Sequence, residues 1–330
     1  MKQGWIPIIL NMGAIVFLLP FSPASAETAQ PNHSKAKVRS AIKRSIPYLE
    51  KKGVEWIRDK KCVSCHRVGN MVWSLSEARN NGFETSEKLD DWIEWSLAAS
   101  LKKNDKGKVV GLGNKEGVAQ LILGVDDLAE ENRRNLLDLL KQEQEPDGSW
   151  KPGGQLPAQK RPPLETRETS TMWIALALQN HAPTAFEKAL HHLNEPLGKS
   201  TEWIALKLLI ARQTKNSLSR KRFARLLIDK QNEDGGWGWL TSEQSDALGT
   251  GIALYALRSA GSELDLASML KAQEFLLSNQ KEGGFWEVRS TKIKKRGAIE
   301  ETASYWGTAW AILGLIKGLE KADGQSSRKN

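Results

Sequence analysis

The chain has 330 residues, of which 40% are hydrophobic and 26% charged, and its formal net charge at pH 7 is +9. This length and composition exclude a disordered or fibrous chain and allow one large core or two small ones. The chain holds two cysteines, which excludes a disulfide framework. Basic residues are spread over many segments and are not interleaved with aromatic residues, so we expect a solvated basic surface and no nucleic-acid partner.

The N-terminal residues 1–26 have the pattern of a secretory signal peptide. Lys2 is the only charge before Glu27, residues 6–21 are largely apolar, and residues 24–26 read Ala-Ser-Ala. An uncleaved membrane anchor is the alternative, although the apolar run is short for a span of about 20 residues and contains proline. We therefore expect an exported mature chain, periplasmic or secreted, with net charge +8 and no transmembrane span.

The main organising feature is a short phrase, Q-x-x-x-G-x-W, that occurs three times. It spans residues 144–150, 231–237 and 280–286. An amphipathic helical pattern precedes each copy, and an apolar segment rich in Ala and Gly follows it. The Gly residues inside the phrase are typical of a helix stop and a tight turn. The phrase therefore predicts a repeat of helix, turn and helix.

Counting outward from these copies predicts six helix pairs. The first, outer helices are expected at 38–59, 86–103, 128–144, 184–194, 218–231 and 264–279. The second, inner helices are expected at 66–80, 115–125, 168–180, 200–212, 245–260 and 301–318. The fourth pair lacks the phrase, but its inner-helix pattern is still recognisable at residues 202–206.

The phrase resembles the QW motif of squalene-hopene cyclases and of their relatives, which include prenyltransferase β subunits and the thioester domain of complement proteins. This resemblance implies an all-α fold, an (α/α)6 toroid, over residues 38–319. Residues 27–37 are then expected to be a flexible segment, and residues 320–330 a disordered tail. The motif is specific for the fold and weak for function, because function depends on a site.

A second motif carries chemistry. Cys62, Cys65 and His66 form a CxxCH sequence, the signature of c-type haem attachment, in which two thiols form thioethers and the histidine binds the iron. A redox dithiol is an alternative, but the sequence around the two cysteines lacks the strand and helix pattern of a thioredoxin. A zinc site is another, but it lacks a fourth ligand. We predict one covalent haem c at the start of the first inner helix, flanked by Trp56 and Trp73.

The sixth ligand of the iron stays open in the sequence. Met71 is too close to His66 on the same helix, whereas Met172 opens another inner helix and is the best placed thioether. An open, five-coordinate iron is equally compatible with the sequence. The other candidates are Met269, His181, His191 and His192. This interpretation implies electron transfer or haem-based redox sensing with a redox partner protein.

The alternative function is a toroid enzyme or binding protein for an apolar or saccharide ligand. The D-x-D-D acid of the cyclases is reduced here to Asp246, so class II terpene cyclase activity is not expected. No Cys or His follows His192, which removes the zinc site of the prenyltransferases, and the Cys-Gly-Glu-Gln segment of the thioester domains is absent. Asp246 is a candidate catalytic acid and Glu168 a candidate cavity residue, although each also fits a helix cap.

Two connections are unusually long. Residues 151–167 are rich in Pro and Gly, and residues 287–300 are basic. Both follow a copy of the phrase, so they belong on the same side of the toroid. We therefore expect them to form lids over one mouth.

Overall fold

The computed structural model describes Met1 and residues 29–319, except 64, 155, 194–197, 262–264 and 296. Over these ranges the chain forms twelve α-helices and no β-strand, which confirms the all-α class. The expected signal peptide, apart from Met1, and the expected tail at 320–330 lie outside the described residues. Among the helices described, none is long and apolar enough to cross a membrane.

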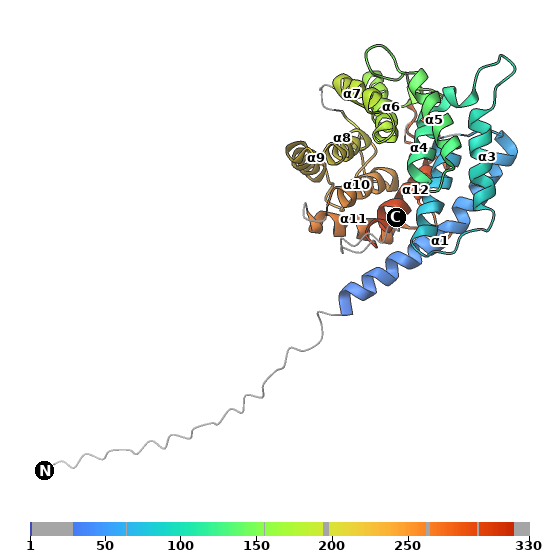
Figure 1. Ribbon diagram of the computed structural model, residues 1–330. Coiled ribbons are helices and arrows are strands. Elements are labelled where there is room, and N and C mark those ends of the chain that lie inside the picture. Colours follow the sequence, from blue (N-terminus) through green and yellow to red (C-terminus); the bar gives the residue numbers. More distant parts are fainter. Residues whose placement is uncertain are drawn as a thin grey trace.

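The helices alternate between an outer and an inner layer, as the six expected pairs require. The outer helices are α1 Ala29–Lys60, α3 Leu89–Leu101, α5 Glu130–Gln142, α7 Pro183–His192, α9 Ser217–Asp229 and α11 Leu266–Asn279. The inner helices are α2 Asn70–Asn80, α4 Lys115–Gly124, α6 Pro163–Leu178, α8 Thr201–Gln213, α10 Ala247–Ala260 and α12 Glu301–Ile316. Figure 1 shows α7, α9 and α11 at the periphery, with α8, α10 and α12 inside them.

The inner helices form a closed ring. Each contacts the next inner helix along the chain, and the last, α12, contacts the first, α2. Every residue of α12 from Ala303 to Ile316 is buried, whereas α5 buries a single stripe of leucines. A helix that is apolar on all sides is stable only when it is surrounded by other helices. The predicted (α/α)6 toroid is thereby confirmed.

Two helices begin earlier than the sequence suggested. α1 begins at Ala29, so most of the segment expected to be flexible is helical. Pro31 falls in the first turn, where a missing N–H costs no hydrogen bond, and Ser34 accepts a hydrogen bond from Gln273 of α11. α6 begins at Pro163, since proline is well suited to the first helical position.

Each copy of the phrase joins neighbouring repeats by the same hydrogen bonds. The tryptophan indole N–H donates to a carbonyl ten residues earlier, in the pairs Trp150–Leu140, Trp237–Leu227 and Trp286–Leu276, at 2.7–2.8 Å. The glutamine amide donates to the next outer helix, in the pairs Gln144–Ala185, Gln231–Ser268 and Gln280–Ala41, at 2.8–2.9 Å. The last pair ties α11 to α1 and so closes the outer layer.

The fourth repeat, which lacks the phrase, is fixed in another way. Glu165 of α6 is buried and accepts hydrogen bonds from the backbone N–H of Lys199, at 2.7 Å, and of Ser200, at 2.8 Å. The Ser200 hydroxyl in turn caps α8 by accepting from the N–H of Trp203. The Glu165 side chain therefore holds the start of α8, where the third, fifth and sixth repeats use the Gly and Trp of the phrase.

Aromatic side chains fill the axis of the ring. Trp73 of α2 lies 5.9 Å from both Trp173 of α6 and Tyr255 of α10, and 5.4 Å from Trp310 of α12, between ring centroids. Because α2, α6 and α10 are separated by other helices around the ring, these side chains meet across its axis. Trp73 is buried in this axial cluster, and its expected place beside a haem stays a prediction.

Candidate functional site

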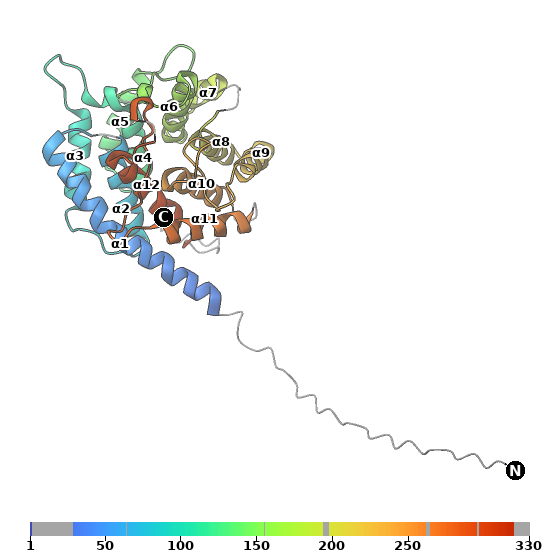
Figure 2. The ribbon, with the colours of Figure 1, turned by 180° about the vertical axis from the view of Figure 1, so that it is seen from behind.

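The two long connections contact one another at one mouth of the toroid. Gln159 and Lys292 form an isolated antiparallel bridge, and the N–H of Lys160 donates to the Thr291 carbonyl at 2.9 Å. The segment before α12, orange-red in Figure 2, thus reaches the chain that enters α6. Residues 163–167 belong to α6, so the first lid is residues 151–162 and the second is residues 287–300.

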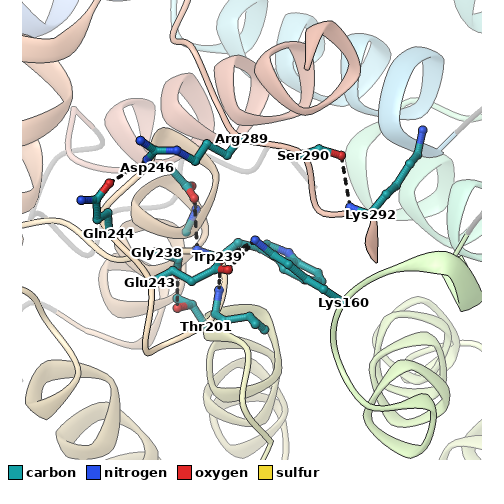
Figure 3. Close-up of polar contacts among 12 residues, drawn as sticks. Lys160, Thr201, Gly238, Trp239, Glu243, Gln244, Asp246, Arg289, Ser290 and Lys292 are labelled. Atoms are coloured by element: carbon teal, nitrogen blue, oxygen red, sulfur yellow. Dashed lines mark hydrogen bonds and ion pairs between the residues drawn. The ribbon is translucent and has the colours of Figure 1, made fainter. Parts of the chain in front are cut away.

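A cleft of about 500 Å³ lies beside the lids, in front of the start of α10. Its wall is polar and apolar in about equal parts. Figure 3 shows three of its lining residues, Asp246, Lys160 and Arg289, together with Trp239, which lies beside Lys160. The lining residues used below are Lys160, Glu243, Gln244, Asp246, Phe275, Asn279, Trp286 and Arg289.

Asp246 is both a helix cap and a cleft residue. One carboxylate oxygen accepts from the N–H of Gly249 at 2.8 Å and the other from the N–H of Trp239 at 3.2 Å. Burial raises the pKa of this carboxyl from its ordinary 3.8 to about 6, against the opposing effect of these hydrogen bonds. Asp246 can therefore hold or release a proton near neutral pH, so both of its sequence interpretations are compatible with the structure.

Charged groups beside Asp246 are held in fixed pairs. Lys160 lies 2.5 Å from a Glu243 carboxylate oxygen, and its ammonium group stands 5.6 Å from the Trp239 ring centroid. Arg289 donates to Gln244 at 2.8 Å. A polar ligand entering the cleft would meet cations, carboxylates and amides that are already oriented.

A second cluster lies buried at the same mouth. Arg161 of the first lid pairs with Glu202 of α8 at 2.5 Å, and Ser170 of α6 donates to Glu116 of α4 at 2.5 Å. Burial, and then the nearby charge of Glu202, raises the pKa of Glu116 from 4.5 to about 7. The site therefore contains a carboxyl that is half protonated near neutrality beside a fixed ion pair.

Glu168 is placed differently from the expectation. It lies in the second turn of α6, not at the start of an inner helix, and it accepts from the Trp203 indole N–H at 2.6 Å. Burial raises the pKa of Glu168. The capping interpretation of Glu168 is wrong because α6 begins at Pro163.

The CxxCH segment lies at the start of the first inner helix, as expected. A π-helical turn, Cys65–Gly69, leads directly into α2. Trp56 of α1 donates to the Cys62 carbonyl at 3.0 Å, and the Cys62 side chain is exposed. Partial desolvation raises the pKa of the Cys62 thiol. Ser64 and the side chains of Cys65 and His66 lie outside the described residues.

The candidate sixth ligands are scattered. Met172 is fully buried on α6, next to Trp173 in the axial cluster, and Met269 is buried on α11. His192 lies 3.5 Å from Asp147. Among the described residues, no three His, Cys, Asp or Glu side chains are grouped to hold a metal ion. Axial ligation by Met172 stays a prediction.

The family described as squalene-hopene cyclase N-terminal domain matches residues 191–293. A type II terpene cyclase from Scytonema has a similar structure, with a TM-score of 0.59 and 12% identity over 87% of this chain and 98% of that chain. These likenesses show the fold alone.

Two further proteins have similar structures. One, a possible member of the GH105 family from Salmonella enterica serovar Paratyphi A, has a TM-score of 0.57 and 12% identity over 92% of this chain and 99% of that chain. Another, a glycosyl hydrolase family 88 protein from Bacteroides vulgatus, has a TM-score of 0.56 and 11% identity over 86% of this chain and 99% of that chain. These likenesses also show the fold alone, so the function has to be argued from the residues at the mouth.

Proposed function

We propose that the protein binds and cleaves a saccharide in the cleft at the mouth of the toroid, with Asp246 as the general acid. The observation that carries this proposal is the position of Asp246. Its carboxyl lines a cleft of about 500 Å³, and burial raises its pKa to about 6. A general acid is most effective when its pKa lies near the working pH.

The lining of the cleft favours a polyhydroxylated ligand over an apolar one. Ammonium, guanidinium, carboxylate and amide groups can donate to and accept from hydroxyl groups, and the partly exposed ring of Phe275 can pack against a sugar ring. An apolar ligand would leave these polar groups desolvated and unpaired. Several proteins with similar structures are described as saccharide-degrading enzymes, which supports the same ligand class.

Two carboxyl groups are available for the cleavage step. In the proposed step, Asp246 donates its proton to the glycosidic oxygen as the bond from that oxygen to the sugar carbon breaks. Glu243, which Lys160 orients at 2.5 Å, accepts a proton from the water molecule that attacks the carbon. The protonated Asp246 and the ion-paired Glu243 thus take different roles because their surroundings differ.

The test is to incubate the mature chain with a panel of neutral and acidic oligosaccharides and to measure the release of reducing ends. Asp246→Asn is expected to lower kcat at least about 100-fold, because it removes the acid but keeps a side chain that can cap α10. Asp265→Asn is the matched control, since Asp265 caps α11 through Ser268 at 3.1 Å outside the cleft. An unchanged kcat in Asp246→Asn would contradict the assignment.

A second candidate function rests on the CxxCH segment. We propose that Cys62 and Cys65 attach one haem c and that His66 binds its iron, for electron transfer or redox sensing in the periplasm or outside the cell. The exposed Cys62 side chain at the first inner helix supports this, because it is open to a large group. The raised pKa of its thiol disfavours a nucleophilic dithiol, whose pKa is usually lowered.

The haem proposal is tested by expressing the full chain together with a cytochrome c maturation system. We expect a pyridine haemochrome spectrum of the c type and a haem that stays on the denatured protein, and we expect both to be lost in Cys62→Ala. Mature protein without bound haem would refute the proposal and leave Cys62 and Cys65 as a dithiol. A redox partner protein is part of this proposal only.

A further inference from the structure

The Arg161 side chain has one used and one unused edge. Its Nη1 atom pairs with Glu202 at 2.5 Å, and the side chain is fully buried. Its Nε and Nη2 atoms are also buried and have no hydrogen-bond partner among the described residues. These two N–H groups form the side of the guanidinium that matches a carboxylate with two parallel hydrogen bonds.

Other buried groups around Arg161 also lack partners. The Trp239 indole N–H is buried without an acceptor in the described part of the chain, and the Trp239 ring centroid lies 5.4 Å from Arg161 Cζ. The amide nitrogen and oxygen of Gln159, two residues before Arg161, are likewise buried and unpaired there. Unsatisfied donors therefore outnumber unsatisfied acceptors.

The described residues leave this excess of buried donors without acceptors, so the donors are available to an acceptor from a ligand. Each unpaired buried polar group costs about 1–3 kcal/mol, and native proteins keep such groups where a ligand or water completes them. Arg161 is paired with Glu202 and Lys160 of the same lid with Glu243, so an acceptor here would be held by the unused edge of Arg161 and not by a spare positive charge. A further carboxyl of this buried cluster, Glu116, accepts a hydrogen bond from Ser170.

We propose that the mouth binds its ligand through a carboxylate, held by the Nε and Nη2 edge of Arg161 and by the indole N–H of Trp239. This inference rests on the proposed function, and it narrows the ligand class to acidic saccharides such as uronic acids. The Asp246 carboxylate accepts a hydrogen bond from the backbone N–H of Trp239. The proposed acid therefore contacts one of the two residues that would bind the ligand carboxylate.

The lids must part for the carboxylate to reach Arg161. The cavity between them, beside Gln159 and Lys292, is about 20 Å³, which is room for a water-sized group only. The lids are joined there by a bridge and one backbone hydrogen bond, and Gly154 and Gly297 have positive φ values of 56° and 84°. Glycine adopts these φ values without strain, so the bridge and the backbone hydrogen bond are the contacts that have to open.

The experiment measures binding of glucuronate, glucose and acetate to the mature chain by calorimetry. We expect glucuronate to bind at least tenfold more tightly than glucose. Arg161→Lys keeps a cation beside Glu202 but lacks the fork, so it should lose this tenfold preference. Trp239→Phe removes the indole N–H and should weaken it. Arg167→Lys, at a partly exposed arginine paired with Asp147, is the control and should keep it.

The outcomes separate this inference from the proposed function. If wild type binds glucose and glucuronate equally, or if Arg161→Lys with an unchanged melting temperature keeps the preference, the carboxylate site is refuted while a saccharide cleft stands. If acetate binds as tightly as glucuronate and glucose does not bind, the carboxylate site stands as a small-acid site, and the saccharide function fails. If none of the three probes binds, water completes these donors and the inference is refuted.

Discussion

Replacing Glu116 by glutamine is expected to stabilise the protein at alkaline pH and to have little effect near pH 4. Burial and the charge of Glu202 raise the pKa of Glu116 from 4.5 to about 7 in the folded protein. Between these pH values the folded chain keeps a proton that the unfolded chain has released. The free energy of unfolding of the wild type therefore falls as pH rises from about 4.5 to about 7 and then levels out.

The size of the effect follows from the two pKa values. A tenfold change in a protonation equilibrium is worth about 1.4 kcal/mol, so the difference between 4.5 and about 7 corresponds to about 3 kcal/mol. Because Glu202 shares the same buried site, we expect the free energy of unfolding of Glu116→Gln to be about 2–3 kcal/mol higher than that of the wild type at pH 8. Glutamine has the same shape and can still accept the hydrogen bond that Ser170 donates.

The assay is urea unfolding of the wild type and Glu116→Gln at pH 4.5, 6 and 8. The control is Glu274→Gln on α11, whose side chain is exposed and should show no such pH dependence. A difference in unfolding free energy between Glu116→Gln and the wild type that is the same at pH 4.5 and pH 8 would refute the reasoning, because the carboxyl would then titrate alike in both states.

Further changes test the closed ring. Gln280→Ala is expected to cost about 2 kcal/mol, as much as Gln231→Ala, because both amides join neighbouring outer helices and a closed ring has no ends. A much smaller loss for Gln280→Ala in urea unfolding would mean that α1 closes the ring only weakly. Gly284→Ala should lower the melting temperature severely, since a Cβ there overlaps the Arg44 carbonyl at a φ of 78°. Gly297→Ala, at a φ of 84° in open space, should cost only about 1 kcal/mol.

The helix pairs could be predicted because their signals are local. Each copy of the phrase supplies its own turn, and each helix supplies its own apolar period, so the order of twelve helices needed no knowledge of distant contacts. The starts of α1 and α6 were missed for a different reason. A proline in the first turn reads as a loop residue in sequence, and only the packed structure distinguishes the two.

The buried cluster could not be predicted in the same way. Arg161 comes from a lid, whereas Glu116 and Glu202 come from two separate repeats, and no spacing in the sequence links the three. One signal was available: Glu116 and Glu202 are each the second residue of an inner helix that is otherwise mostly apolar. A carboxylate at the same position of two buried helices needs a polar or charged partner. For Glu202 that partner is Arg161, which lies on the long connection before α6.

The mouth also bears on which chemistry this toroid supports. A terpene-type reaction needs an apolar chamber, yet Trp73, Trp173 and Trp310 fill the axis by contacts across the ring. The space that remains lies off the axis, beside the lids, and its walls carry charges and amides. Replacing a carboxylate that only caps a helix would change the stability alone. Asp246 caps α10 and also lines this cleft. The proposed acid therefore lies where a polar ligand is accessible, and the closed axis leaves no equivalent place for an apolar one among the described side chains.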